Sequence, residues 1–171
     1  MNGKKIFALS NPDALCAAVA QTWLKKSLKH DPPATKPGSI TDKTQMTALQ
    51  QTAGKASETA LPANGLQIVS QNISSGHTWE QNISWLLIDS GFLYLTMKNP
   101  GHAAACYIGA SSWFFLDAEV GLFEFNSKAE FIKSVSEFYA GRTNSPGNAE
   151  FKIYKVDLMV KGKDKGKCTI I

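Results

Sequence analysis

The sequence predicts a single α+β domain in which helices come first along the chain and a mostly antiparallel sheet follows. Its 171 residues suit one domain, because a domain takes roughly 100 to 200 residues. A hydrophobic content of 43% with 19% charged residues excludes a disordered chain, which cannot bury enough apolar surface to fold. Apolar residues recur at helical spacing early in the chain, and short apolar or alternating segments bounded by Gly and Asn follow.

The first helix is predicted over residues 14–28, where apolar residues follow the 3.6-residue period and an Asn-Pro-Asp sequence directly before them supplies start signals. The prolines and glycine of residues 31–39 end this helix in a loop. Residues 41–59 are rich in Gln, Thr and Ala, which indicates either a marginal, exposed helix or a mobile insertion. We place the insertion at about residues 31–64, and we expect the part from residue 41 onward to add little to the core.

The second half of the chain supplies the sheet. Residues 66–69 are predicted as a short strand and residues 78–88 as an amphipathic helix. Four segments then have the pattern of an antiparallel meander, namely residues 92–97, 103–108, 112–116 and 121–125. A helix over residues 128–139 and a last strand over residues 151–160 complete the layout.

Positive charge is concentrated at the C-terminus. The net charge is +4, and the tail of residues 161–171, with four lysines against one aspartate, holds most of it. The domain of residues 1–160 is therefore close to neutral, which argues against a nucleic-acid-binding protein. No apolar run approaches the roughly 18 residues of a membrane span, so we expect membrane association only through this tail. The tail is interpreted as solvated or strand-extending, although residues 168–171 also have the shape of a prenylation signal.

Three cysteines lie at wide, irregular spacing: Cys16, Cys106 and Cys168. Their number and spacing predict neither a disulfide framework nor a zinc site, and His30 and His77 stand far apart in polar contexts. We therefore expect no metal and no other cofactor. A reducing compartment follows from the cysteine usage, and at least one thiol is available for chemistry.

A predicted hairpin between two central strands brings a histidine to an aspartate. The Gly-Ala dipeptide at 109–110 fits a two-residue loop, which would pair Ile108 with Ser111. His102 then faces Asp117 on one side of the sheet, with Cβ atoms roughly 4.5 to 5.5 Å apart, within reach of a hydrogen bond. A one-residue shift of register would separate the two side chains, and the alternative is a pair that merely flanks strand ends in solvent.

Cys16 lies at the start of the first predicted helix. Unpaired backbone N–H groups and the helix dipole favour an anion there, and a thiolate is the anion that nucleophilic catalysis needs. A cysteine in an amphipathic helix is otherwise a small core residue, an interpretation that suits Cys106 in mid-strand. A cysteine at a helix start, followed far downstream by His102 and Asp117 on adjacent strands, is the papain-type order of parts.

Two segments resemble a known family. The first runs Asn-Pro-Asp-Ala-Leu-Cys over residues 11–16, and the second runs from Gly-His-Ala at 101–103 through Phe-Phe-Leu-Asp at 114–117 to Gly-Leu-Phe-Glu-Phe at 121–125. Both are similar to the YopT/AvrPphB-type cysteine peptidases of the C58 family, which are bacterial effector proteases with a papain-like fold. The chain departs from the family in having Ala-Glu after the aspartate, where Pro-Asn is usual.

The resemblance implies a papain-like fold and a catalytic triad. Cys16 matches the nucleophile, His102 the general base and Asp117 the residue that orients the base. Asn11 lies where related enzymes place a side-chain amide for the oxyanion, although an Asn before Pro is also a good helix N-cap. The implied substrate is a protein in a host or target cell, reached through a dedicated export system because no Sec-type signal is visible. No nucleic-acid partner is implied, and a monomer is favoured.

Two other classes of function stay open. The same triad can serve a deamidase, a transglutaminase-like enzyme or a peptidoglycan amidase, because one fold supports several acyl-transfer reactions. A papain-like domain without catalysis would instead be a binding module.

Overall fold

The structure is a computed structural model, and it describes residues 1–10, 15–30, 33–53, 58–75, 77–85, 90–98, 101–142 and 150–160. Within these residues one sheet is formed, in the strand order β1-β6-β5-β4-β3-β7-β2, and every neighbouring pair is antiparallel. The strands are β1 (Lys4–Phe7), β2 (Leu66–Ser75), β3 (Gly91–Lys98), β4 (His102–Ile108), β5 (Trp113–Asp117), β6 (Gly121–Phe125) and β7 (Glu150–Leu158).

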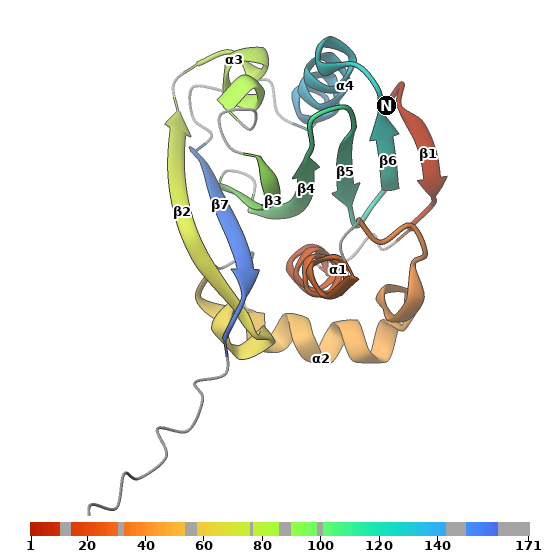
Figure 1. The fold of residues 1–171 in the computed structure, drawn as a ribbon, viewed down its shortest axis with the longest axis vertical. Helices are drawn as coiled ribbons and strands as arrows, with labels where there is room; N and C mark the ends of the chain where they lie inside the picture. The colour runs from red at the N-terminus through yellow and green to blue at the C-terminus, as the bar shows by residue number, and fades with distance from the viewer. Residues whose placement is uncertain are drawn as a thin grey trace, which may run out of the picture.

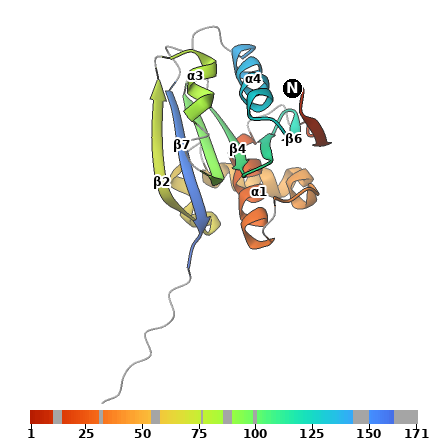
Figure 2. The same cartoon turned by 45° about the horizontal axis from the view of Figure 1, so that its top comes forward.

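Helices cover both faces of this sheet. They are α1 (Cys16–His30), α2 (Lys43–Ala53), α3 (Trp79–Ser84) and α4 (Lys128–Ala140), with short 3-10 helices at Gly38–Thr41, Glu58–Ala60 and Pro62–Asn64. Figure 1 shows α1 and α2 on one side of the central strands and α3 and α4 on the other, and Figure 2 shows the same layers after rotation. The result is three layers, with the sheet in the middle.

The core has two parts, one on each face of the sheet. Ala103 and Ala105 of β4 belong to the part under α1, whereas Ala104 and Cys106 belong to the part under α4. This alternation follows from the two-residue period of a strand. Because Ala103 and Ala105 are small, α1 can pack closely on β4. Trp23 of α1 is buried, with its ring centroid 6.1 Å from that of Phe92 and its Nε1–H donating to the Ala34 carbonyl at 2.9 Å.

The α+β class predicted from the sequence is confirmed. The first helix, the four strands of the meander, the helix after them and the last strand all begin and end within about two residues of their predicted bounds. The predicted helix over residues 78–88 is shorter, and residues 86–89 lie outside the described part of the chain.

Two edge elements differ from the prediction. The strand predicted over residues 66–69 continues to Ser75, because its polar second half pairs with β7 along the whole length. β1 was not predicted at all, since its Lys-Lys-Ile-Phe sequence is short and charged. It pairs with β6, where Gly121 has a φ of 106°, and a Cβ atom there would lie 2.1 Å from the carbonyl oxygen of Phe7. A glycine is thus required at this turn.

The prediction that the segment from residue 41 to residue 64 adds little to the core was wrong. Met46, Ala60 and Leu61 are buried in the same part of the core as α1, and the Met46 sulfur lies 3.8 Å from the hydroxyl of Thr22. Met46 and the partly buried Leu49 lie three residues apart on one face of the otherwise polar α2 and anchor it, whereas Ala60 and Leu61 follow that helix. Mobility of this segment stays a prediction, which limited proteolysis can test.

None of the helices in the described part of the chain is long and apolar enough to cross a membrane. Asn11 and the basic tail of residues 161–171 lie outside the described residues.

Candidate active site

Cys16 is the first residue of α1, and its side chain is almost completely buried. Two contacts fix this end of the helix: the Val19 amide donates to the Leu15 carbonyl at 3.0 Å, and the Ala18 amide donates to Oε1 of Gln50 at 2.9 Å. Gln50 belongs to α2, so the segment predicted as an insertion caps one of the free amides of the helix that carries Cys16. Sequence analysis missed Gln50, because no local pattern links it to α1.

His102 and Asp117 meet at the ends of two neighbouring strands. His102 is the first residue of β4, Asp117 is the last residue of β5, and both are buried. Nε2 of His102 is hydrogen-bonded to Oδ2 of Asp117. The sequence-predicted pair is therefore present in the structure.

The register that led to this pair was predicted incorrectly. Ile108 pairs with Trp113 and not with Ser111, and the loop is closed by a 3.0 Å hydrogen bond from the Gly109 amide to the Ser112 carbonyl. The shift is two residues, and an even shift leaves every side chain on its original face. His102 and Asp117 therefore interact diagonally and not as directly opposed residues.

The second oxygen of the Asp117 carboxylate is also engaged. Oδ1 accepts a hydrogen bond from the Glu119 amide at 2.9 Å, and Nη2 of Arg142 lies 4.0 Å from it. The same guanidinium forms an ion pair with the Glu119 carboxylate. Both oxygens of Asp117 therefore act as acceptors, which fixes the orientation of the carboxylate toward His102.

The charge state of His102 follows from its neighbours. Burial acts to lower the pKa of the imidazole, but hydrogen bonds to Asp117 and to the Cys16 thiol, with the negative charges of both groups, outweigh burial and raise the pKa to about 9. Nε2 is bonded to Asp117, and the imidazole lines the same cavity as Cys16, so Nδ1 is the ring nitrogen available to the thiol. His102 thus links the thiol to the carboxylate and is protonated at neutral pH.

Asp117 is fully buried, whereas Cys16 and His102 line a small cavity of about 210 Å³. Its lining residues come from the start of α1, the start of β4, the turn after β5 and the end of α4: Leu15, Cys16, Gly101, His102, Ala118, Glu119 and Arg142. A thiol, an imidazole and a carboxylate in this sequence can generate a nucleophile and shuttle its proton.

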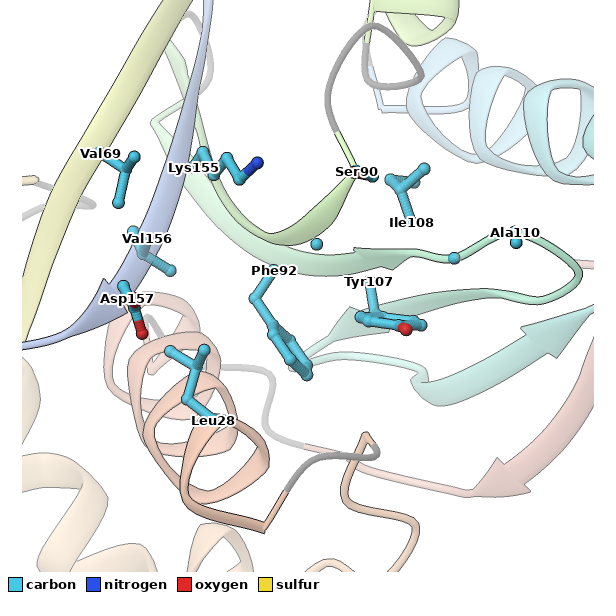
Figure 3. A pocket seen from close by; sticks show the side chains of 12 residues that line it. Leu28, Val69, Ser90, Phe92, Tyr107, Ile108, Ala110, Lys155, Val156 and Asp157 are labelled. Carbon is cyan, nitrogen blue, oxygen red and sulfur yellow. The ribbon is translucent and has the colours of Figure 1, made fainter.

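A larger cavity, of about 710 Å³, lies elsewhere in the fold (Figure 3). It is lined by Leu28 near the end of α1, by the rings of Phe92 and Tyr107, and by residues of β7. Its described lining residues include no cysteine or histidine, so its size does not make it the site of thiol chemistry.

Among the described residues, Cys106, His30 and His77 do not line the cavity that holds Cys16 and His102, and Cys168 lies outside the described residues. Cys106 is fully buried in β4, and burial raises the pKa of its thiol well above the usual value. The ring of His77 stacks on Trp85. Within the described residues no three His, Cys, Asp or Glu side chains lie together in a way that could hold a metal ion.

No protein-family model matches the sequence, and no curated protein matches it in a sequence comparison. In its fold the chain is similar to the Pseudomonas avirulence protein AvrPphB, with a TM-score of 0.64 and 15% identity over 92% of this chain and 97% of that chain. The fold is papain-like. AvrPphB gives its name to the family that the sequence resembles, so the resemblance is confirmed at the level of the fold.

A second solved structure with this fold is the ubiquitin-specific protease encoded by the murine cytomegalovirus tegument protein M48, in complex with a ubiquitin-based suicide substrate. It aligns with a TM-score of 0.56 and 13% identity over 91% of this chain and 85% of that chain. At such identities the likeness establishes the fold alone, and the chemistry of this chain has to be argued from its own side chains.

Proposed function

We propose that this protein is a cysteine protease of the C58-like, papain-like type, in which Cys16 is the nucleophile, His102 the general base and Asp117 the residue that orients the imidazole. The observation that carries the proposal is the position of His102, a buried imidazole that is hydrogen-bonded through Nε2 to the buried Asp117 carboxylate and lines one cavity with the Cys16 thiol, and both partners raise the pKa of His102. A histidine in a purely structural role has no need of both partners.

In the proposed resting enzyme, Nδ1 of His102 already holds the proton of the Cys16 thiol, and in the first step the thiolate attacks the carbonyl carbon of the scissile peptide bond. Asp117 holds Nε2–H and stabilises the imidazolium. The backbone amide of Cys16, at the free N-terminal end of α1, is one donor for the oxyanion. Asn11 is proposed as the second donor.

In the second step, the tetrahedral intermediate collapses and the imidazolium donates its proton to the departing amine, which leaves a thioester on Cys16. His102 then takes a proton from water, and the resulting hydroxide attacks the thioester carbonyl. Collapse releases the carboxylic acid and the Cys16 thiolate, and the proton that stays on His102 restores the resting state. Each turnover consumes one water molecule and needs no cofactor.

The proposed substrate is a protein of a host or target cell, and the proposed enzyme is an effector that a dedicated bacterial export system delivers. The support is the fold shared with AvrPphB and with a protease that was solved on a ubiquitin-based substrate. The cavity that Cys16 and His102 line is small, which suits an extended chain better than a large rigid ligand.

The test is a digest of cell lysate with the wild-type protein and with Cys16→Ala, followed by sequencing of the new protein N-termini. New N-termini that appear with the wild type and with Cys106→Ala, but not with Cys16→Ala, support the proposal. If the wild type and Cys16→Ala give the same N-termini, proteolysis is excluded.

The same digest separates the other classes of function. A mass increase of about 1 Da at Gln or Asn, without new N-termini, would indicate a deamidase. Binding of lysate proteins that is equal for the wild type and Cys16→Ala, without any chemical change, would indicate a binding module.

A further inference from the structure

Arg142 lies beside the candidate triad although no sequence pattern points to it. It follows the end of α4, where its amide donates to the Tyr139 carbonyl at 3.0 Å. Its guanidinium carbon lies 5.1 Å from the centroid of the Phe138 ring, which supports the flat face of the cation. The side chain is 18% exposed and lines the same cavity as Cys16 and His102.

The contacts of Arg142 converge on the carboxylates behind His102. Nη2 is paired with the exposed carboxylate of Glu119 and lies 4.0 Å from Oδ1 of the fully buried Asp117. Glu119 also donates its amide to the same Oδ1. The turn after β5 and the end of α4 are thus tied together around one oxygen of Asp117, while the other oxygen faces His102.

A buried carboxylate needs a permanent counter-charge, and His102 cannot supply one. In the proposed reaction the imidazole is charged before the leaving group departs and neutral immediately afterwards, so Asp117 loses its cationic partner once in every turnover. A guanidinium keeps its charge at every accessible pH. Arg142 is the cation placed to compensate Asp117 at the moment when His102 is neutral.

We propose that Arg142 is a positioning residue of this site, which compensates the charge of Asp117 and so allows His102 to release its proton to the leaving amine. The inference rests on the proposed function, because it assigns a role within the same triad. Without the cation, Asp117 would hold the proton on the imidazolium more tightly, and the direct repulsion between Arg142 and the imidazolium would also be lost. Both effects act in the same direction.

The other ionisable groups around His102 and Asp117 do not change the expected direction of the effect, a rise in the pKa of His102 when Arg142 is removed. Cys16 faces His102 from α1, Glu119 faces Asp117 from the turn after β5, and Tyr139 of α4 places its ring 6.4 Å from the imidazole. Burial raises the pKa of Tyr139 and of Cys106 well above their usual values, so both stay neutral while His102 titrates.

The experiment is an NMR titration of the histidine C2–H signals, of which the chain has three. The His102 signal is assigned from His30→Gln and His77→Gln proteins. In the wild type it should titrate near pH 9. In Arg142→Met and Arg142→Gln it should titrate at least about 0.5 unit higher, a roughly threefold gain in proton affinity. Arg142→Lys, which keeps the charge, should stay near the wild type. Lys133→Met, which removes an exposed cation from α4, should have no effect.

Three outcomes are separable. If both neutral variants titrate at or below the wild-type value while keeping the wild-type amide spectrum, the role of Arg142 is overturned and the proposed function stands. A fall toward pH 6.5 in these variants would indicate loss of the Asp117 contact, and it also overturns the role. If wild-type His102 itself titrates near pH 6.5, the bridge between Cys16 and Asp117 is absent and the proposed function fails first.

Discussion

Replacement of Asp117 by asparagine isolates the contribution of the buried carboxylate. Many papain-like enzymes carry an asparagine as the third member of the triad, so the exchange is not disruptive in itself. In this chain, however, both oxygens of Asp117 accept hydrogen bonds, one from His102 and one from the Glu119 amide. An amide has one acceptor end, so in Asp117→Asn a donor must face either the imidazole or the Glu119 amide.

The magnitude follows from the pKa of His102. The surroundings raise it from 6.5 to about 9, and at 1.36 kcal/mol per unit this corresponds to about 3 kcal/mol in favour of the imidazolium. Asp117 is the main source, with Cys16 second, whereas burial opposes both. In Asp117→Asn we expect the pKa of His102 to fall well below 9. We expect kcat/KM to fall by about 10² to 10⁴, the upper figure being that of the serine-protease triad.

The assay is kcat/KM against pH on a peptide cleaved by the wild type, together with the free energy of unfolding in urea. Asp157→Asn is the matched control, because Asp157 is an exposed residue of β7 that bonds its carboxylate to the adjacent Leu158 amide. The alkaline limb of activity should lie near pH 9 in the wild type and in the control, and lower in Asp117→Asn. An Asp117→Asn protein with an undiminished rate and an unmoved limb would refute the reasoning.

Three further predictions concern stability, measured by urea unfolding. Met46→Ala should lower the free energy of unfolding by about 2 to 5 kcal/mol, because Met46 is fully buried under α1, whereas Lys43→Ala on the exposed side of α2 should change it by less than about 0.5 kcal/mol. Equal effects would mean that α2 does not pack as described. Gln50→Ala should lower the free energy of unfolding by about 1 kcal/mol, because the Ala18 amide loses its acceptor, whereas replacement of the exposed Gln51 by Ala should leave it unchanged. An unchanged free energy of unfolding in Gln50→Ala would show that this hydrogen bond does not stabilise α1. The wild type should lose up to about 3 kcal/mol as the pH rises from 6.5 through 9, because the raised pKa of His102 stabilises the fold fully below 6.5 and not above 9. A His102→Gln protein should lack this slope, and a slope of equal size in both proteins would assign it to other groups.

The candidate site was predictable because its parts lie on strongly patterned elements. Cys16 precedes a clear helical period, and His102 and Asp117 bound two apolar strands joined by a short loop. The predicted two-residue hairpin loop led to the right pair although its register was wrong. The observed loop has four residues, which shifts the pairing of β4 with β5 by two residues and leaves each side chain on its predicted face. A shift of one would have destroyed the prediction.

The residues that support the triad were out of reach of the sequence. Gln50 and Arg142 contact the site across long stretches of chain, from a polar helix and from the turn after α4. Neither position has a local signal, because a glutamine in a polar helix and an arginine at a helix end are ordinary solvent-exposed residues. β1 was missed for a related reason, since four residues with two lysines become a strand only through pairing with β6.

The central claim is that His102 activates the Cys16 thiol, and the most direct measurement is the rate of alkylation by iodoacetamide at pH 6. This reagent needs no recognition of a substrate and reacts with the thiolate. Cys16 should be modified well before the buried Cys106, and the rate at Cys16 should fall at least tenfold in His102→Ala, whereas His77→Ala should match the wild type. If Cys16 reacts at the same rate with and without His102, the two residues do not form a catalytic pair.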